Sequence, residues 1–105
     1  MELRHLIELL DAQNLLIEEP QVKDPAISLQ RVSADSRALD SNTVFVAVRG
    51  VRADGHDFIS SAVSQGVSVI VGERSVGEMK LDQATYIHVS SSQRALGWIA
   101  SELYG

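Results

Sequence analysis

The sequence contains no cysteine, which excludes disulfide bonds and thiolate metal sites. It also lacks an excess of basic residues, since its formal net charge is -5. A general nucleic-acid-binding surface needs an excess of positive charge, so we do not expect nucleic acid as a partner. The absence of cysteine fits a cytoplasmic protein, and that is the location we expect.

Long apolar runs are missing as well. None approaches the roughly 20 apolar residues that span a bilayer. The first residues, 1–6, do not combine a basic segment with an apolar one, as a secretory leader does. We therefore expect a protein that is neither exported nor in contact with a membrane.

Several common site motifs are absent. The sequence has no GxxxxGK[ST] phosphate loop and no GxGxxG after a predicted strand. The histidines His5, His56 and His88 show no metal-ligand spacing. Ser36 lacks the flanking glycines of a nucleophile elbow. These absences predict no metal site and no complete catalytic apparatus in these 105 residues.

The residues that are present predict one domain with its own core. The chain has 105 residues, of which 45% are hydrophobic, and both values are typical of a single globular domain. Helical spacing of apolar residues predicts helices near residues 3–10, 58–66 and 92–103. Short apolar or alternating runs predict strands at 27–33, 43–48, 67–71 and 85–89. Residues 15–17 fit either a short strand or the end of the first helix.

The expected order is helix, strand, strand, helix, strand, strand, helix. Strands interleaved with helices predict an α/β layered domain. Because strands and helices do not alternate strictly, we expect a mixed, mostly parallel sheet flanked by helices.

Two polar clusters lie on either side of the strand predicted at 43–48. The first comprises Asp35, Ser36 and Arg37, at the end of the preceding strand. Arginine suits paired contacts with phosphate or carbonyl oxygens, so this loop can offer groups to a polar ligand. The simpler interpretation is that Asp35 and Arg37 hold the loop together while Ser36 caps it. Both interpretations remain open from these residues alone.

The second cluster follows the same strand and comprises Gly50, Arg52, Asp54, Gly55 and His56. The two glycines permit backbone geometries that other residues avoid. Arg52 and Asp54 can face a ligand or each other, and the alternative is a surface turn with a weak ion pair. We expect His56 to be exposed at the start of a helix. Before the strand, Asn42 is expected to adopt a positive φ in a turn.

These segments together resemble a known family. Ala-Asp-Ser-Arg at 34–37, Asn-Thr-Val-Phe-Val-Ala-Val at 42–48 and Gly-Val-Arg-Ala-Asp-Gly-His-Asp-Phe-Ile at 50–59 are similar to the N-terminal domain of the Mur ligases. These ATP-dependent enzymes extend the peptide of the bacterial cell-wall precursor. The pattern is most similar to the members that add the third residue, and the members that add D-alanyl-D-alanine are the alternative. A stand-alone, non-catalytic binding or regulatory module is the alternative from another class.

The resemblance implies a domain that holds the UDP part of UDP-N-acetylmuramoyl-L-alanyl-D-glutamate. Ala34 and Ser36 would meet the uridine end of this substrate. Val51, Arg52 and Ala53 would line the uracil and ribose pocket, partly through backbone groups. The other residues of the motif would support these loops: Asp35, Arg37, Asn42, Gly50, Asp54 and Gly55.

The resemblance also implies a longer enzyme. Residues 1–105 would be its N-terminal, UDP-substrate-binding domain, and the central ATP-binding and C-terminal domains would lie elsewhere in the protein. ATP and Mg²⁺ are expected cofactors of the full-length ligase, with none bound by these residues. The residues that catalyse amide formation would also lie in the other domains, and so would those that select the added amino acid.

Overall fold

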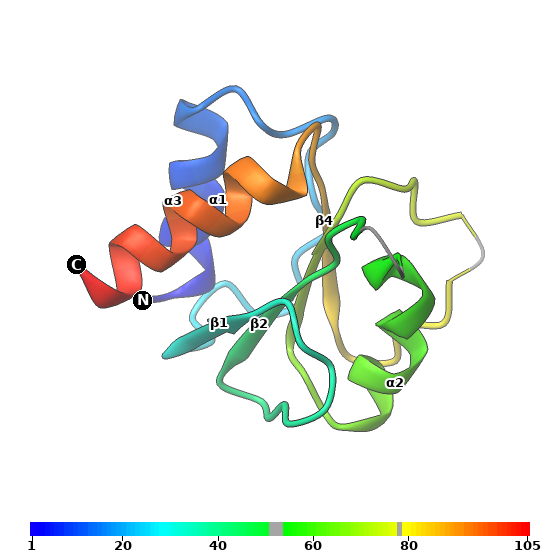
Figure 1. The fold of residues 1–105 in the computed structure, drawn as a ribbon. Coiled ribbons are helices and arrows are strands. Elements are labelled where there is room, and N and C mark those ends of the chain that lie inside the picture. Colours follow the sequence, from blue (N-terminus) through cyan, green and yellow to red (C-terminus); the bar gives the residue numbers. More distant parts are fainter. Residues whose placement is uncertain (51–53, 78) are drawn as a thin grey trace.

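A four-stranded sheet forms the centre of the fold in the computed structural model, which describes residues 1–50, 54–77 and 79–105 (Figure 1). The elements follow in the order α1 (Leu3–Ala12), β1 (Arg31–Ser33), β2 (Thr43–Val46), η1 (Gly55–Phe58), α2 (Ile59–Ser64), β3 (Val69–Gly72), β4 (Thr85–His88) and α3 (Ser92–Tyr104). This is the predicted order, with a short 3₁₀ helix, η1, added before α2. None of the helices formed by the described residues is both long and apolar enough to cross a membrane.

The strands lie in the spatial order β1-β2-β3-β4, and all three neighbouring pairs are parallel. The α/β layered class and the predominance of parallel pairing are therefore confirmed. The expectation of a mixed sheet is wrong, because antiparallel pairing among the described residues is limited to isolated bridges such as Leu16–Val89. Our prediction assumed that a parallel connection needs a helix. Here the segments 34–42 and 73–84 return the chain to the start of the next strand without one.

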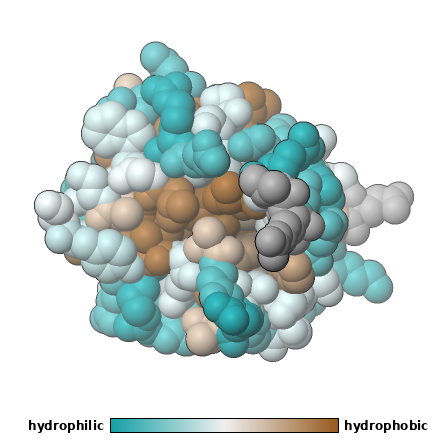
Figure 2. Space-filling model, viewed as in Figure 1, coloured by the Kyte–Doolittle hydropathy of each residue, from teal (hydrophilic) through white to brown (hydrophobic). Residues whose placement is uncertain are grey.

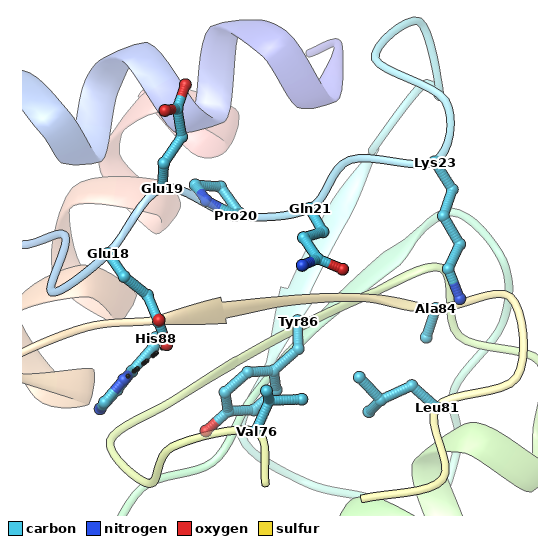
Figure 3. Close-up of a pocket in the computed structure, with 10 residues that line it drawn as sticks. All are labelled: Glu18, Glu19, Pro20, Gln21, Lys23, Val76, Leu81, Ala84, Tyr86 and His88. Atoms are coloured by element: carbon cyan, nitrogen blue, oxygen red, sulfur yellow. Dashed lines mark hydrogen bonds and ion pairs between the residues drawn. The ribbon is translucent and has the colours of Figure 1, made fainter.

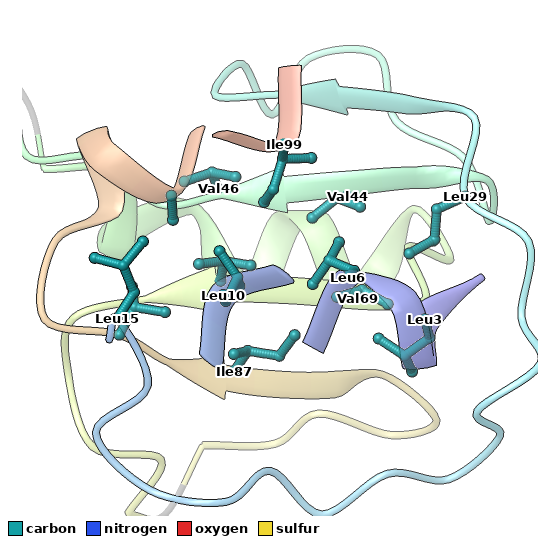
Figure 4. Close-up of a cluster of buried hydrophobic side chains, with 13 residues drawn as sticks. Leu3, Leu6, Leu10, Leu15, Leu29, Val44, Val46, Val69, Ile87 and Ile99 are labelled. Carbon is teal, nitrogen blue, oxygen red and sulfur yellow. The ribbon is translucent and has the colours of Figure 1, made fainter. Parts of the chain in front are cut away.

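The sheet is covered on both faces, which explains its continuous apolar strands. All four residues of β2 are buried. Val44 and Val46 belong to a core shared with α1 and α3 (Figure 4), whereas Phe45 packs with α2 on the opposite face. The structure therefore has three layers, with helices on either side of the sheet.

Helices α1 and α3 cover one face of the sheet. Leu3, Leu6 and Leu10 of α1 are fully buried there. Ser91 caps α3, because its hydroxyl accepts a hydrogen bond from the Arg94 N–H at 3.2 Å. At the other end of α3, the Tyr104 hydroxyl lies against the backbone of the edge strand β1 and accepts a 2.8 Å hydrogen bond from the Val32 N–H.

Several boundaries differ from the sequence prediction. The strand expected at 27–33 is regular only over Arg31–Ser33, and residues 15–17 are extended, with the Ile17 N–H donating to the His88 carbonyl at 3.0 Å. Gly66 follows the C-cap of α2 with a φ of 85°, a conformation common for glycine at the end of a helix.

The positive φ expected at Asn42 is wrong, since the described non-glycine residues with positive φ are Asn14 and Asp82. Asn42 instead stabilises its turn through hydrogen bonds. Its side chain donates to the Ser28 carbonyl at 3.1 Å, and its N–H donates to the Asp40 carboxylate at 2.9 Å.

Candidate functional site

Parallel strands bring their carboxyl ends to one edge of the sheet, and open α/β sheets commonly bind ligands beyond that edge. The two predicted site loops follow the neighbouring strands β1 and β2, so both begin at this edge. Ala34 is exposed and Ser36 half-buried in the first loop. In the second loop the structure places Gly50 and Asp54, while Val51, Arg52 and Ala53 lie outside the described residues.

Asp35 and Arg37 bind each other in the first loop. The Arg37 Nε lies 3.0 Å from both carboxylate oxygens of Asp35, and the Arg37 N–H donates to Asp35 Oδ1 at 2.9 Å. The side-chain hydrogen bond from Arg37 lowers the pKa of Asp35, and the same bond raises the pKa of Arg37. This geometry favours the interpretation in which Asp35 and Arg37 hold the loop together. Their supporting role toward a ligand stays a prediction.

Gln65, which directly follows α2, holds the backbone of the first loop. Its Nε2 donates to the Ser36 carbonyl, and its Oε1 accepts a hydrogen bond from the Leu39 N–H at 3.0 Å. Helix α2 therefore fixes the position of the loop that carries Ser36. This contact was not predictable from the sequence, because a glutamine before a helix-ending glycine is ordinarily solvent-exposed.

The base of the second loop is closed by backbone contacts. Arg49 and Asp54 form an isolated antiparallel bridge, and the Gly55 N–H donates to the Val48 carbonyl at 2.9 Å. Gly55 has no room for a side chain, since an added Cβ would lie 2.6 Å from the Val48 nitrogen. A glycine is needed here for close backbone approach.

The Asp54 carboxylate makes most of the polar contacts in this region. It accepts hydrogen bonds from the His56 N–H at 3.0 Å, the His56 Nδ1 at 2.6 Å and the Arg74 Nη2 at 3.0 Å. Arg49 Nε lies 3.6 Å from the same carboxylate. The backbone hydrogen bond from His56, followed by the one from its ring, holds the pKa of Asp54 well below its usual range.

The expectation that His56 is exposed is wrong. Its side chain is only 2% exposed, because the ring lies between Asp54 and the backbone of Glu73. Glu73 and Arg74 are partners of this loop that the sequence does not indicate, because both lie far from it along the chain. His88 lies in the edge strand β4, with its Nε2 2.9 Å from the Glu73 carbonyl.

Two cavities lie near these elements. One, of about 200 Å³, lies at the β4 edge between segment 18–23 and residues 76–86, with Tyr86 and His88 among its lining residues (Figure 3). Burial raises the pKa of Tyr86 to about 12, and its hydroxyl donates to the Arg74 carbonyl at 2.6 Å. The other cavity, of about 440 Å³, is bordered by His56, Arg74 and Lys80. The described residues contain no group of three or more His, Cys, Asp or Glu able to hold a metal ion.

The low pKa of Asp54 predicts an acid-dependent loss of stability. Because the folded chain holds this carboxyl below the unfolded value of about 3.9, folding is favoured above that pH, and the advantage disappears as pH falls through the folded pKa. Asp54→Asn should therefore be less stable than the wild type at pH 7, and the difference should shrink between about pH 5 and pH 2. Urea unfolding at several pH values measures this.

Asp11→Asn is the control for that series, because Asp11 is exposed at the end of α1. Its difference from the wild type should stay small at every pH. A constant difference between Asp54→Asn and the wild type would contradict the assigned contacts of Asp54.

The comparison with known families agrees with this arrangement of strands and loops. A family model described as "Mur ligase family, catalytic domain" matches residues 28–104. The chain belongs to the Mur ligase family. This confirms the family suggested by the segments at 34–37, 42–48 and 50–59.

The similar curated proteins are Mur ligases several times longer than this chain. The UDP-N-acetylmuramoyl-L-alanyl-D-glutamate–2,6-diaminopimelate ligase of Clostridium tetani is 38% identical over 80 residues, covering 75% of this chain and 16% of that ligase. The ligase of the same name from Parabacteroides distasonis is 34% identical over 105 residues, covering 100% of this chain and 20% of that protein. The chain thus spans a fifth or less of these relatives.

Solved structures in the family share the fold. The D-alanyl-D-alanyl-adding ligase of Acinetobacter baumannii has a TM-score of 0.64 and 26% identity over 90% of this chain and 20% of its own. The MurF ligase of Thermotoga maritima in complex with ADP has a TM-score of 0.58 and 37% identity over 70% of this chain and 16% of its own. The assignment of this Mur ligase chain to a non-catalytic N-terminal domain remains a prediction.

Proposed function

We propose that residues 1–105 form the N-terminal domain of a Mur ligase and anchor the UDP moiety of UDP-N-acetylmuramoyl-L-alanyl-D-glutamate. Ala34 and Ser36 contact the uridine end, and Val51, Arg52 and Ala53 complete the pocket. The observation that carries the proposal is topological. The two loops with the family motif follow adjacent parallel strands and leave the sheet at the same edge.

The first loop is suited to binding because its backbone is already fixed. Gln65 holds Ser36 and Leu39, and the Asp35–Arg37 pair closes the turn around Ser36. A loop held in one conformation loses less entropy when a ligand binds. Ser36 can then offer its hydroxyl, and its neighbours their backbone groups, to a uracil or ribose without rearrangement.

Apolar surface is available beside this loop. Figure 2 shows apolar side chains gathered between α3 and strands β1 and β2 on the face seen in Figure 1. Val32 of β1, Leu96 of α3 and Val48, which follows β2, are only partly buried. A planar base can pack against such a surface while its polar edge meets the loop, which is the usual composition of a small-molecule site.

In this proposal the domain supplies binding energy and the remaining domains supply the chemistry. Holding the UDP end fixes the distant D-glutamate carboxylate, so that its activation and attack by the incoming amine need little further ordering. ATP and Mg²⁺ would be bound by the central and C-terminal domains of the full-length cytoplasmic enzyme. Those domains would also contain the catalytic residues.

Titration of the chain with UDP tests the proposal. We expect UDP to bind, and Ser36→Ala to weaken binding about tenfold through loss of one hydrogen bond in a desolvated site. Isothermal titration with UDP and with the UDP-sugar dipeptide gives both values. Ser41→Ala is the matched control, because Ser41 is exposed in the turn at the opposite end of the same connection. No binding at millimolar UDP would refute a self-sufficient site.

The members that add D-alanyl-D-alanine are the second candidate. The solved structures described above support them, whereas the curated relatives carry the name of the diaminopimelate ligase. Incubating the full-length ligase with ATP and either UDP-muramoyl dipeptide plus a diamino acid, or UDP-muramoyl tripeptide plus D-alanyl-D-alanine, separates the two. Formation of neither product would favour a non-catalytic binding module.

A further inference from the structure

His56 uses both of its ring nitrogens in the folded protein. Nδ1 lies 2.6 Å from Asp54 Oδ1, and Nε2 lies 2.8 Å from the Glu73 nitrogen. A backbone N–H can only donate, so Nε2 must carry a lone pair. The Asp54 carboxylate accepts, so Nδ1 must carry the hydrogen. The geometry therefore selects the neutral Nδ1–H tautomer and orients the ring by both of its ends.

The Asp54 side of this contact leads to the loop after β2. Asp54 forms the bridge and the ion pair with Arg49 at the base of that loop. The Arg74 guanidinium, from the connection after β3, donates to the second carboxylate oxygen. His56 thus sets the position of the carboxylate that holds the two ends of the loop together.

The Glu73 side leads to the next two elements. The Glu73 carbonyl accepts a hydrogen bond from the His88 ring of β4. Its carboxylate accepts the Ser92 N–H in the first turn of α3 at 2.7 Å. A continuous set of hydrogen bonds therefore runs from the loop after β2, through His56, to the ends of β3 and β4 and the start of α3.

The ring is also closely packed. A Cβ added to Gly72 would lie 3.1 Å from His56 Nε2, so the adjacent strand leaves little room for the ring to move. A buried group with two opposite hydrogen bonds can hold a fixed spacing between the segments it joins.

We propose that His56 is a positioning residue for the substrate loop: it couples the Asp54 end of the loop after β2 to the Glu73 peptide after β3, and so keeps the carboxyl edge of the sheet ready to bind. This inference rests on the proposed UDP site. His56 acts through Asp54 and Glu73, and no contact of its own with the ligand is required.

Two substitutions separate the two hydrogen bonds. His56→Asn keeps a donor near the Nδ1 position for Asp54 and loses the acceptor for Glu73. His56→Gln places an acceptor near the Nε2 position for Glu73 and loses the donor for Asp54. Both variants should bind UDP about tenfold more weakly than the wild type, because Asp54 and the Glu73 peptide are then no longer held in place by the same ring. Titration is done well below the unfolding midpoint of each variant, with folding verified by circular dichroism.

His5→Asn is the matched control, because His5 is exposed on α1 and its ring contacts Glu102 of α3. It should bind UDP like the wild type. Folded His56→Asn and His56→Gln chains with wild-type affinity would overturn the proposal, since a purely structural role changes stability and leaves affinity intact.

A ligand-independent measurement separates this proposal from the UDP site itself. Nitrogen-15 shifts of the His56 ring should show Nε2 without a hydrogen. Hydrogen exchange of the Glu73 amide should be at least tenfold faster in His56→Asn than in His56→Gln. If the wild type does not bind UDP, the proposed function is refuted. A hydrogen on Nε2, or equal exchange of the Glu73 amide in the two variants, refutes the coupling through His56 whether or not UDP binds.

Discussion

Replacing Gly55 by alanine is expected to lower the free energy of unfolding by about 3 kcal/mol, near the upper end of the usual cost of overpacking. The new Cβ would lie 2.6 and 2.9 Å from the nitrogen and oxygen of Val48, and 3.1 Å from the Ala47 carbonyl carbon. All three are backbone atoms, so no side chain can move aside. The chain must shift the end of β2 or the start of η1, which also strains the Gly55–Val48 hydrogen bond. Urea unfolding followed by circular dichroism measures the loss.

Gly97→Ala is the matched control for this prediction. Gly97 lies inside α3, and nothing lies within 4 Å of a Cβ added there. Since alanine is the better helix former, this substitution should stabilise the chain by about 0.5 to 1 kcal/mol. Equal effects of the two substitutions would show that the close approach at Gly55 is not present in solution.

Phe45→Ala is expected to cost about 4 kcal/mol, within the range measured for large-to-small core substitutions of phenylalanine. Phe45 is fully buried in β2 and packs among residues of the α2 face, including Ile59, Ala62 and Tyr86. Its neighbours come from separate elements, helix α2 and strand β4 among them, so they cannot easily collapse into the space it leaves. The midpoint of urea unfolding should fall with little change in the slope of the transition.

Phe58→Ala provides the comparison, because Phe58 is 42% exposed at the end of η1. Its loss should cost less than about 1 kcal/mol, since little apolar area returns to water. A cost for Phe45→Ala no larger than that for Phe58→Ala would contradict the burial of Phe45 between the sheet and α2.

The core of the fold was predictable because its signals are local. Val44, Val46 and Ile70 lie in short apolar runs that are too short for helices, and Leu3 and Leu6 repeat at helical spacing. The direction of the strands was not predictable in the same way. It depends on how segments 34–42 and 73–84 return across the sheet, and these segments carry no periodic pattern.

The candidate site was predictable only in part. The motif residues Asp35 to Arg37 are contiguous, and their mutual hydrogen bonds follow from short-range chemistry. Gln65 and Glu73 contribute through contacts with residues 29 and 17 positions away in the sequence, and nothing in their neighbours indicates those partners. The prediction that His56 is exposed was wrong for the same reason. A histidine can be buried when other groups form hydrogen bonds with its ring, and Glu73 is recognised as such a partner only from the fold.

The contact between Tyr104 and β1 affects how readily the chain aggregates with other chains. β1 is one of the two edge strands of the sheet, and the exposed amide of such a strand is a site where a foreign strand can add. The Tyr104 hydroxyl accepts a hydrogen bond from the Val32 N–H at 2.8 Å and lies 3.4 Å from the Val32 carbonyl oxygen. Tyr104 of α3 therefore protects this edge of the sheet from edge-to-edge aggregation. A strand from another chain would first have to break the hydrogen bond between Tyr104 and Val32.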